Sequence, residues 1–230
     1  MEILLASHSP RRKELLQTLQ VPFSVVQVDC EEVVPEGIAP TQTPQYLSQQ
    51  KAQAYLQSHT LQANQILLTA DTIVLLENQV LGKPTDEQHA RWMLQHLSNH
   101  THQVITGVTL AYQGAEGLSE GSGNFAESPE NPVAGVGEAT QPHILSFACT
   151  THVHFIALTD SQIDYYIDAF RPMDKAGAYG IQEWIGHIGI DHIEGDYLNV
   201  MGLPLSLLYK HLLQIPLFAR YEKDTKHKNI

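Results

Sequence analysis

The stretch ILLASHSPRRKELLQTL, residues Ile3–Leu19, decides the fold that we expect for this chain. Its apolar run Ile3–Leu5 is typical of a buried strand, and Pro10 suits the first position of a helix that Ser9 caps. Three leucines in the second half give this helix an apolar face. The stretch therefore predicts a buried strand that passes through a tight polar turn into a helix.

The start of that helix favours an anion, because its free N–H groups point into the turn. Two hydroxyls and two guanidinium groups lie beside it, from Ser7, Ser9, Arg11 and Arg12. A planar guanidinium matches phosphate better than an ammonium group does. The residues alone leave a second interpretation open, a capped first helix with surface arginines.

Length and composition narrow the class of protein. The 230 residues suffice for one large domain or two small lobes, and the net charge of −12 argues against a nucleic-acid partner. No apolar run approaches the roughly 18–20 residues of a membrane span, and no signal peptide is visible. The two cysteines form no framework. We therefore expect a cytoplasmic protein with neither a nucleic-acid nor a membrane partner.

Alternating strand-like and helix-like segments predict a mixed α/β sheet with flanking helices. Strands are expected at 21–28, 66–76, 80–81, 103–112, 144–158 and 184–190, the last followed by a turn and another short strand. Helices are expected from Pro10, from Pro44 to about 59, after the capping box at Thr85, after the capping box at Thr159, and from about 202 to 213. Segment 113–143 is rich in Gly, Glu, Ser and Pro and predicts a long loop, with a lid as the alternative. The tail beyond 217 is polar and expected to fray.

Asp71 is the best single candidate for chemistry. It follows the apolar run Ile66–Ala70, and a carboxylate at the end of a strand can bind Mg²⁺ or activate water. Glu31 or Glu32, after another strand, could share a metal with it. The alternatives are a turn residue and a solvated acidic pair.

Other chemistries find little support in the chain. The 13 histidines include pairs at 100/102 and 152/154 that would each share a strand face, but no zinc motif accompanies them. We expect histidines on the surface or lining a cleft. Neither a GxSxG sequence nor a P-loop is present.

Six motifs in order along nearly the whole chain resemble one family, the Maf nucleoside-triphosphate pyrophosphatases. They are SHSPRR (7–12), ADTIV (70–74), GKP (82–84), the LS…HQVITGV run ending at 108, DKAGAYGIQ (174–182) and NVMGLPL (199–205). Arg11, Thr72 and Gln182 are similar to the dTTP/UTP branch, whereas the branch acting on 7-methyl-GTP carries other residues there.

The resemblance implies an inosine-triphosphatase-like α/β fold with two lobes around a cleft, a divalent cation (Mg²⁺ or Mn²⁺) and a homodimer. It implies one catalytic domain over 1–216, with an insertion at 113–143 and a polar tail at 217–230. The implied reaction hydrolyses dTTP or UTP to the monophosphate and pyrophosphate, which could cleanse the nucleotide pool.

The resemblance also implies roles for single residues. Asp71 would accept the proton and bind the metal with Glu32, and Arg11, Thr72 and Gln182 would set substrate choice. Phosphate contacts would come from Ser7, Arg12, Lys51, Lys83 and Lys175.

Two departures and two rival functions stay open. The segment 113–143 is longer than the family's usual connection, and His8 stands where a small residue is usual. One rival is a pyrophosphatase for modified or non-canonical nucleotides. The other is a nucleotide-binding regulator of cell division without turnover.

Overall fold

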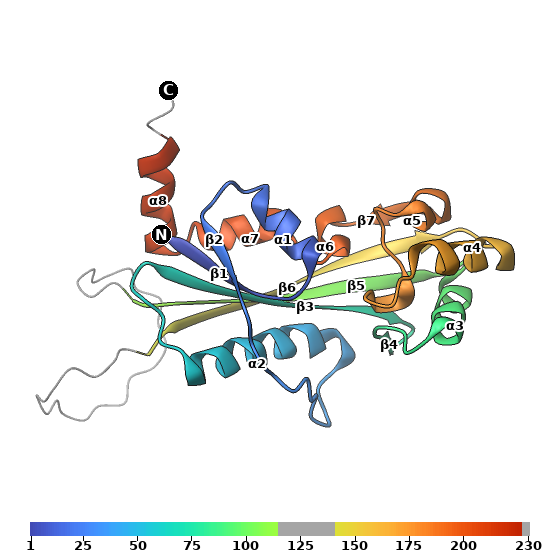
Figure 1. The fold of residues 1–230 in the computed structure, drawn as a ribbon, viewed down its shortest axis with the longest axis horizontal. Helices are drawn as coiled ribbons and strands as arrows, with labels where there is room; N and C mark the ends of the chain where they lie inside the picture. The colour runs from blue at the N-terminus through green and yellow to red at the C-terminus, as the bar shows by residue number, and fades with distance from the viewer. Residues whose placement is uncertain (115–140, 227–230) are drawn as a thin grey trace, which may run out of the picture.

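A mixed seven-stranded sheet runs along the length of the molecule in the computed structural model, which describes residues 1–114 and 141–226 (Figure 1). The strand order is β2-β1-β3-β5-β6-β7, and β4 pairs with β3 outside this path. The strands are β1 (Glu2–Ala6), β2 (Phe23–Val26), β3 (Gln65–Leu76), β4 (Gln79–Leu81), β5 (Thr101–Tyr112), β6 (His143–Phe155) and β7 (Ile190–Glu194). The expected mixed sheet is confirmed.

Helices flank both faces of this sheet. They are α1 (Pro10–Gln17), α2 (Thr43–Ser58), α3 (Glu87–Leu97), α4 (Asp160–Phe170), α5 (Trp184–Gly189), α6 (Tyr197–Met201), α7 (Leu205–Leu212) and α8 (Pro216–Lys226), with short 3-10 helices η1 (Pro40–Gln42) and η2 (Ala176–Ala178). Figure 1 shows α2 on one face and α1, α6 and α7 on the other, while α3, α4 and α5 gather at one end. No helix in the described ranges is long and apolar enough to cross a bilayer.

The strand β1 lies in parallel between β2 and β3, which makes α1 and α2 crossover helices. The turn from β1 into α1 forms as the sequence predicts. Pro10 occupies the first turn of α1, and the Ser9 hydroxyl accepts a hydrogen bond from the backbone N–H of Arg12. The apolar face of α1 buries Leu15 and Leu16 in the same core cluster as Ile3.

The strand β3 continues past the point where its parallel neighbour ends. Ala6, the last residue of β1, pairs with Thr69, whereas β3 stays paired with β5 as far as Leu75. Asp71 therefore lies inside a strand rather than at its end, which corrects the expected position. It nevertheless lies beside the end of β1, so that one edge of β3 is free there to line a site.

The N-terminus of α2 packs directly on β5 beside this point. Gly107 of β5 pairs with Asp71, and a Cβ on Gly107 would lie 2.2 Å from the backbone N of Gln45 in α2. Only a residue without a side chain permits this contact. Gly107 thus sets the distance between α2 and the sheet.

The starts of the helices expected from Pro44 and after Thr85 need correction. Gln42 and not Thr43 precedes α2, because η1 runs straight into it, and no side chain caps it. Asp86 and not Thr85 caps α3, because the Asp86 carboxylate accepts from the N–H of His89. The capping box of Thr159 and Gln162 on α4 is confirmed.

The C-terminal part differs from expectation in two elements. Residues 184–190, predicted as a strand, form α5 and the first residue of β7. The tail predicted to fray forms α8, in which Phe218 is fully buried. Of the predicted loop 113–143, residues 115–140 lie outside the described residues, and His143 already belongs to β6.

We expect Gly107→Ala to destabilise the fold by about 1–3 kcal/mol, because the added methyl must push α2 away from β5. Urea unfolding measures the loss. Gly82→Ala is the matched control, since its Cβ would meet nothing within 4 Å. Equal urea midpoints for the two variants would contradict the close contact.

Candidate active site

A cleft of about 550 Å³ opens where β1 ends beside β3. Its wall contains every residue to which the family resemblance assigns a role. These are Ser7, Arg11, Arg12, Glu32, Lys51, Asp71, Thr72, Lys83, Lys175 and Gln182. They come from segments that lie far apart in the sequence, so the fold brings together what the motifs predicted separately.

Arg12 joins three of these segments through its guanidinium group. It donates to the Ser7 hydroxyl (3.3 Å) before α1, to the Ala70 carbonyl (2.9 Å) and the Thr72 hydroxyl (2.9 Å) of β3, and to the Gly202 carbonyl (2.9 Å) after α6. Four of its five N–H bonds are thereby used. Burial lowers the pKa of Arg12, and the nearby Asp71 carboxylate opposes that shift. Arg12 is therefore part of the framework of the cleft, with one N–H bond left to offer a ligand.

Neighbouring residues of β3 serve opposite faces of the sheet, as alternation along a strand requires. The Asp71 carboxylate lies on the α2 side, where Lys51 contacts it at 2.7 Å. The Thr72 hydroxyl lies on the other side, between Arg12 and the Thr106 hydroxyl, 3.0 Å away. Because β1 has ended, both side chains still line the same cleft.

Lys51 of α2 bridges the two candidate carboxylates. Its Nζ lies 2.7 Å from Oδ1 of Asp71 and 2.8 Å from Oε1 of Glu32. Partial burial opposes ionisation of Glu32, but the hydrogen bond and charge of Lys51 outweigh it and hold the pKa of Glu32 below its ordinary value. Lys51, Asp71 and Glu32 therefore form one charged cluster beside α2.

This cluster suits a hard divalent cation. Asp71 and Glu32 each use one oxygen on Lys51, and across the described part of the chain their second oxygens accept no hydrogen bond. Carboxylate oxygens are the ligands that Mg²⁺ and Mn²⁺ prefer. The residues present therefore fit such an ion, with Glu32 and not Glu31 on the wall of the cleft.

The opposite wall contains a second chain of charges, which the sequence did not reveal as such. Asp174 accepts from Arg11 at 2.7 Å and from Lys175 at 2.8 Å. Lys175 also lies 3.1 Å from Glu183, whose other oxygen takes the Tyr166 hydroxyl. Partial burial opposes ionisation of Asp174, but hydrogen bonds from Lys175 and Arg11 outweigh it and lower its pKa. The signal was present in the motif DKAGAYGIQ, where an acid adjoins a lysine.

Two further candidates are free to receive a ligand. The Oε1 atom of Gln182 is buried and lacks a hydrogen-bond partner among the described residues. Lys83 is exposed on the loop after β4 and lines the same cleft. His8, which stands where a small residue is usual in the family, also lines the cleft, and its side chain is exposed.

Buried hydrogen bonds hold α6 against the sheet behind Arg12. The side-chain amide of Asn199 donates to the Val104 carbonyl and to the Thr151 hydroxyl, both at 3.0 Å, and its backbone carbonyl accepts from the Thr106 hydroxyl at 3.2 Å. This fixes the segment that ends at Gly202, whose carbonyl accepts from Arg12. The sequence identified the motif NVMGLPL (199–205), but it did not reveal that this segment supports Arg12.

A buried hydrogen-bonded pair of side chains, His102 and Tyr179, lies beside the cleft. Nε2 of His102 lies 2.7 Å from the hydroxyl of Tyr179, which lines the cleft. Burial, reinforced by the charge of His154, lowers the pKa of His102 to about 3. His102 therefore stays neutral at physiological pH.

The chain is similar to known proteins along almost its whole length. The Maf-like protein family matches residues 2–215. The chain is 41% identical over 212 residues to the dTTP/UTP pyrophosphatase of Porphyromonas gingivalis, covering 92% of each chain. It is 43% identical over 215 residues to the dTTP/UTP pyrophosphatase of Phocaeicola vulgatus, covering 93% of this chain and 96% of the other.

A solved structure also matches, at a much greater distance. It is a nucleoside-triphosphatase / dITP/XTP pyrophosphatase from Mycobacterium abscessus, 14% identical with a TM-score of 0.33, covering 66% of this chain and 74% of its own.

We expect Arg12→Lys to cost about 2–4 kcal/mol of stability, because an ammonium group cannot span the acceptors on β3 and after α6 and leaves some of them unpaired. Arg11→Lys is the control. Its partly exposed ion pair with Asp174 can be kept, and we expect a loss below about 1 kcal/mol. Urea unfolding compares the stability of the two variants. Equal losses of stability would contradict the role of Arg12 in the framework of the cleft.

The low pKa of His102 predicts an acid-sensitive fold. The unfolded chain binds a proton near pH 6.5 that the folded chain refuses until about pH 3, so stability falls as pH drops through this window. We expect the wild type to lose about 2 kcal/mol more than His102→Gln between pH 7 and pH 5. Urea unfolding at both pH values measures this difference, and parallel losses would contradict it.

Proposed function

This chain belongs to the Maf family, and we propose that it is a hydrolase that converts dTTP and UTP to the nucleoside monophosphate and pyrophosphate. The observation that carries the proposal is the convergence of one cationic turn and one acidic strand on a single cleft. The names of its relatives support the same activity.

The triphosphate would lie against the turn between β1 and α1. At the start of α1, Pro10 has no N–H, and the N–H groups of Arg12 and Lys13 donate to Ser9. The backbone N–H of Arg11 and the remaining guanidinium N–H of Arg12 would therefore meet the phosphate oxygens. Lys51 and Lys83 would approach from the other side, and Arg11 and Lys175 from the second wall. Most of these cations already contact carboxylates, so the anion would share or replace partners that are in place.

Asp71 would activate the water. Lys51 holds its Oδ1 atom, which leaves Oδ2 to accept a proton from a water molecule. The water oxygen would attack the α-phosphorus, the bond from that phosphorus to the bridging oxygen would break, and pyrophosphate would leave. The chain's own contribution is to position the water and to neutralise charge on the phosphates.

A divalent cation, Mg²⁺ or Mn²⁺, would be held by Asp71 and Glu32. When bound, it would supply charge neutralisation on the phosphate oxygens. The second oxygen of Glu32, which Lys51 does not contact, supports this assignment. On Asp71 the carboxylate has about four lone pairs, which leaves room for a metal bond beside the proton acceptor.

Gln182 would read the base. Its buried and unpaired Oε1 atom suits the N3–H group of uracil or thymine, and its amide nitrogen suits O4. Thr72 would act on substrate choice through Arg12, because its hydroxyl already accepts from that side chain. A homodimer and a cytoplasmic location remain predictions.

The test of this function is pyrophosphate release from a panel of nucleotides. We expect release from dTTP and UTP in the presence of Mg²⁺ and none in its absence. Asp71→Asn should lower kcat by about 10²–10⁴, since it removes the proton acceptor while nearly preserving shape.

The control variant is Asp164→Asn, which changes a partly exposed carboxylate that pairs with Arg91 outside the cleft. It should keep full turnover. Full activity in Asp71→Asn would remove Asp71 from the mechanism. Preference for modified nucleotides over dTTP and UTP, or binding without turnover, would favour one of the rival functions.

A further inference from the structure

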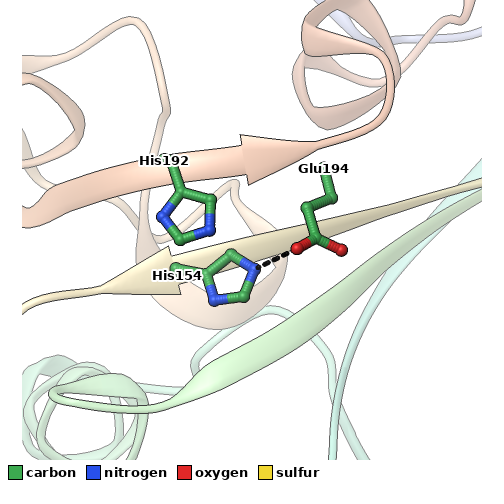
Figure 2. A group of neighbouring side chains, drawn as sticks. All are labelled: His154, His192 and Glu194. Atoms are coloured by element: carbon green, nitrogen blue, oxygen red, sulfur yellow. Dashed lines mark ion pairs between the residues drawn. The ribbon is translucent and has the colours of Figure 1, made fainter.

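We propose that His154, His192 and Glu194 form a binding site for a divalent transition metal, with Zn²⁺ as the first candidate (Figure 2). The site lies on β6 and β7, at the sheet edge opposite to β2. It is separate from the cleft, none of whose lining residues it contains. The sequence alone did not favour a histidine metal site, because the partners only meet once β7 pairs with β6.

The register of the two strands brings the three side chains together. His154 pairs with His192 across the strands, and Glu194 follows His192 by two residues on the same face. The imidazole rings stack, with centroids 3.9 Å apart and planes inclined by 12°. One ligand atom from each residue lies within 4.8 Å of the others.

Hydrogen bonds on the far side of each ring fix which nitrogen faces the cluster. Nδ1 of His192 lies 2.8 Å from the Asp191 carboxylate, and Nδ1 of His154 lies 2.7 Å from the Thr101 hydroxyl. A carboxylate on one ring nitrogen makes that nitrogen the donor and leaves Nε2 as a lone pair, the arrangement common behind metal-bound histidines. The Nε2 atom of each ring is therefore the one left for a ligand.

Nε2 of His154 lacks a hydrogen-bond partner. The atom is buried and makes no hydrogen bond within the described residues. It lies 3.7 Å from Oε1 of Glu194, too far for a hydrogen bond. Two ligand atoms that share a tetrahedral Zn²⁺ at about 2.0–2.2 Å are separated by about 3.4 Å, which is close to this distance. The two nearly parallel rings would turn relative to one another so that both Nε2 atoms face the ion.

The donor set selects the class of metal. Two imidazoles and one carboxylate are a recurrent set for Zn²⁺ and leave at least one position open. Imidazole nitrogen suits Zn²⁺, Ni²⁺ and Cu²⁺ better than Mg²⁺, which prefers oxygen. His192 and Glu194 are more than half exposed, so the open position faces solvent.

A bound ion would clamp the edge strand that leads to the cleft. After Glu194 the chain passes through Gly195 to Asp196, which caps α6, and α6 ends at the Gly202 carbonyl bound by Arg12. Ligands on β6 and β7 would therefore hold the support of Arg12 in place.

Isothermal titration with Zn²⁺ alone tests the site on the full chain, in a buffer that contains Mg²⁺ to compete at the carboxylates of the cleft. We expect one strongly bound Zn²⁺ per chain in the wild type and in Asp71→Asn. His192→Ala and Glu194→Gln should each weaken binding at least about tenfold, because loss of even an outer-shell partner costs about 10–100-fold. Zn²⁺ should also raise the unfolding temperature of the wild type but not of His192→Ala.

The control is His96→Ala, which removes an exposed histidine of α3 whose Nδ1 contacts its own helix. It should bind Zn²⁺ like the wild type. Equal affinity in all variants, no saturable binding in the wild type, or loss in Asp71→Asn but not in His192→Ala would each overturn the proposal.

Discussion

The guanidinium group of Arg12 is the interaction on which the site depends. It spans the gap left where β1 ends, and it joins the turn at Ser7, the strand at Ala70 and Thr72, and the carbonyl of Gly202. Each of these contacts holds a segment that contains a candidate site residue or lies against such a segment. Without this side chain, these hydrogen bonds would no longer join the turn, β3 and the end of α6.

The second constraint is charge pairing inside the cleft. Carboxylates hold the cations of the cleft in place while no ligand is bound. They do so for Lys51, Arg11 and Lys175. In the proposed function Asp71 and Glu32 would therefore serve twice, as partners of Lys51 and as oxygen donors for a cation. Such a site is organised in advance, so that binding a polyanion costs little rearrangement.

Local sequence signals predicted the local structure well. The Ser9 cap, the capping box at Thr159 and the apolar faces of α3 and α4 follow from spacing alone. Features that depend on distant partners were not predictable in this way. Residues 184–189 form a helix although their composition suits a strand, and Phe218 is buried by packing. The ion pair of Asp174 with Arg11 depends on a distant segment of the chain. Asp71 lines the cleft, but the sequence placed it at a strand end, because the early end of β1 cannot be seen in the sequence of β3.

The most direct test of the account is a crystal structure with a UTP analogue whose α,β-bridge is an imido group that resists hydrolysis. We predict that its phosphates contact the start of α1, with the α-phosphorus next to Asp71 and the uracil edge on Gln182. The hydrogen bonds of Arg12 to Ala70 and Gly202 should persist. Phosphates bound away from the turn, or a base seated on it, would contradict the account.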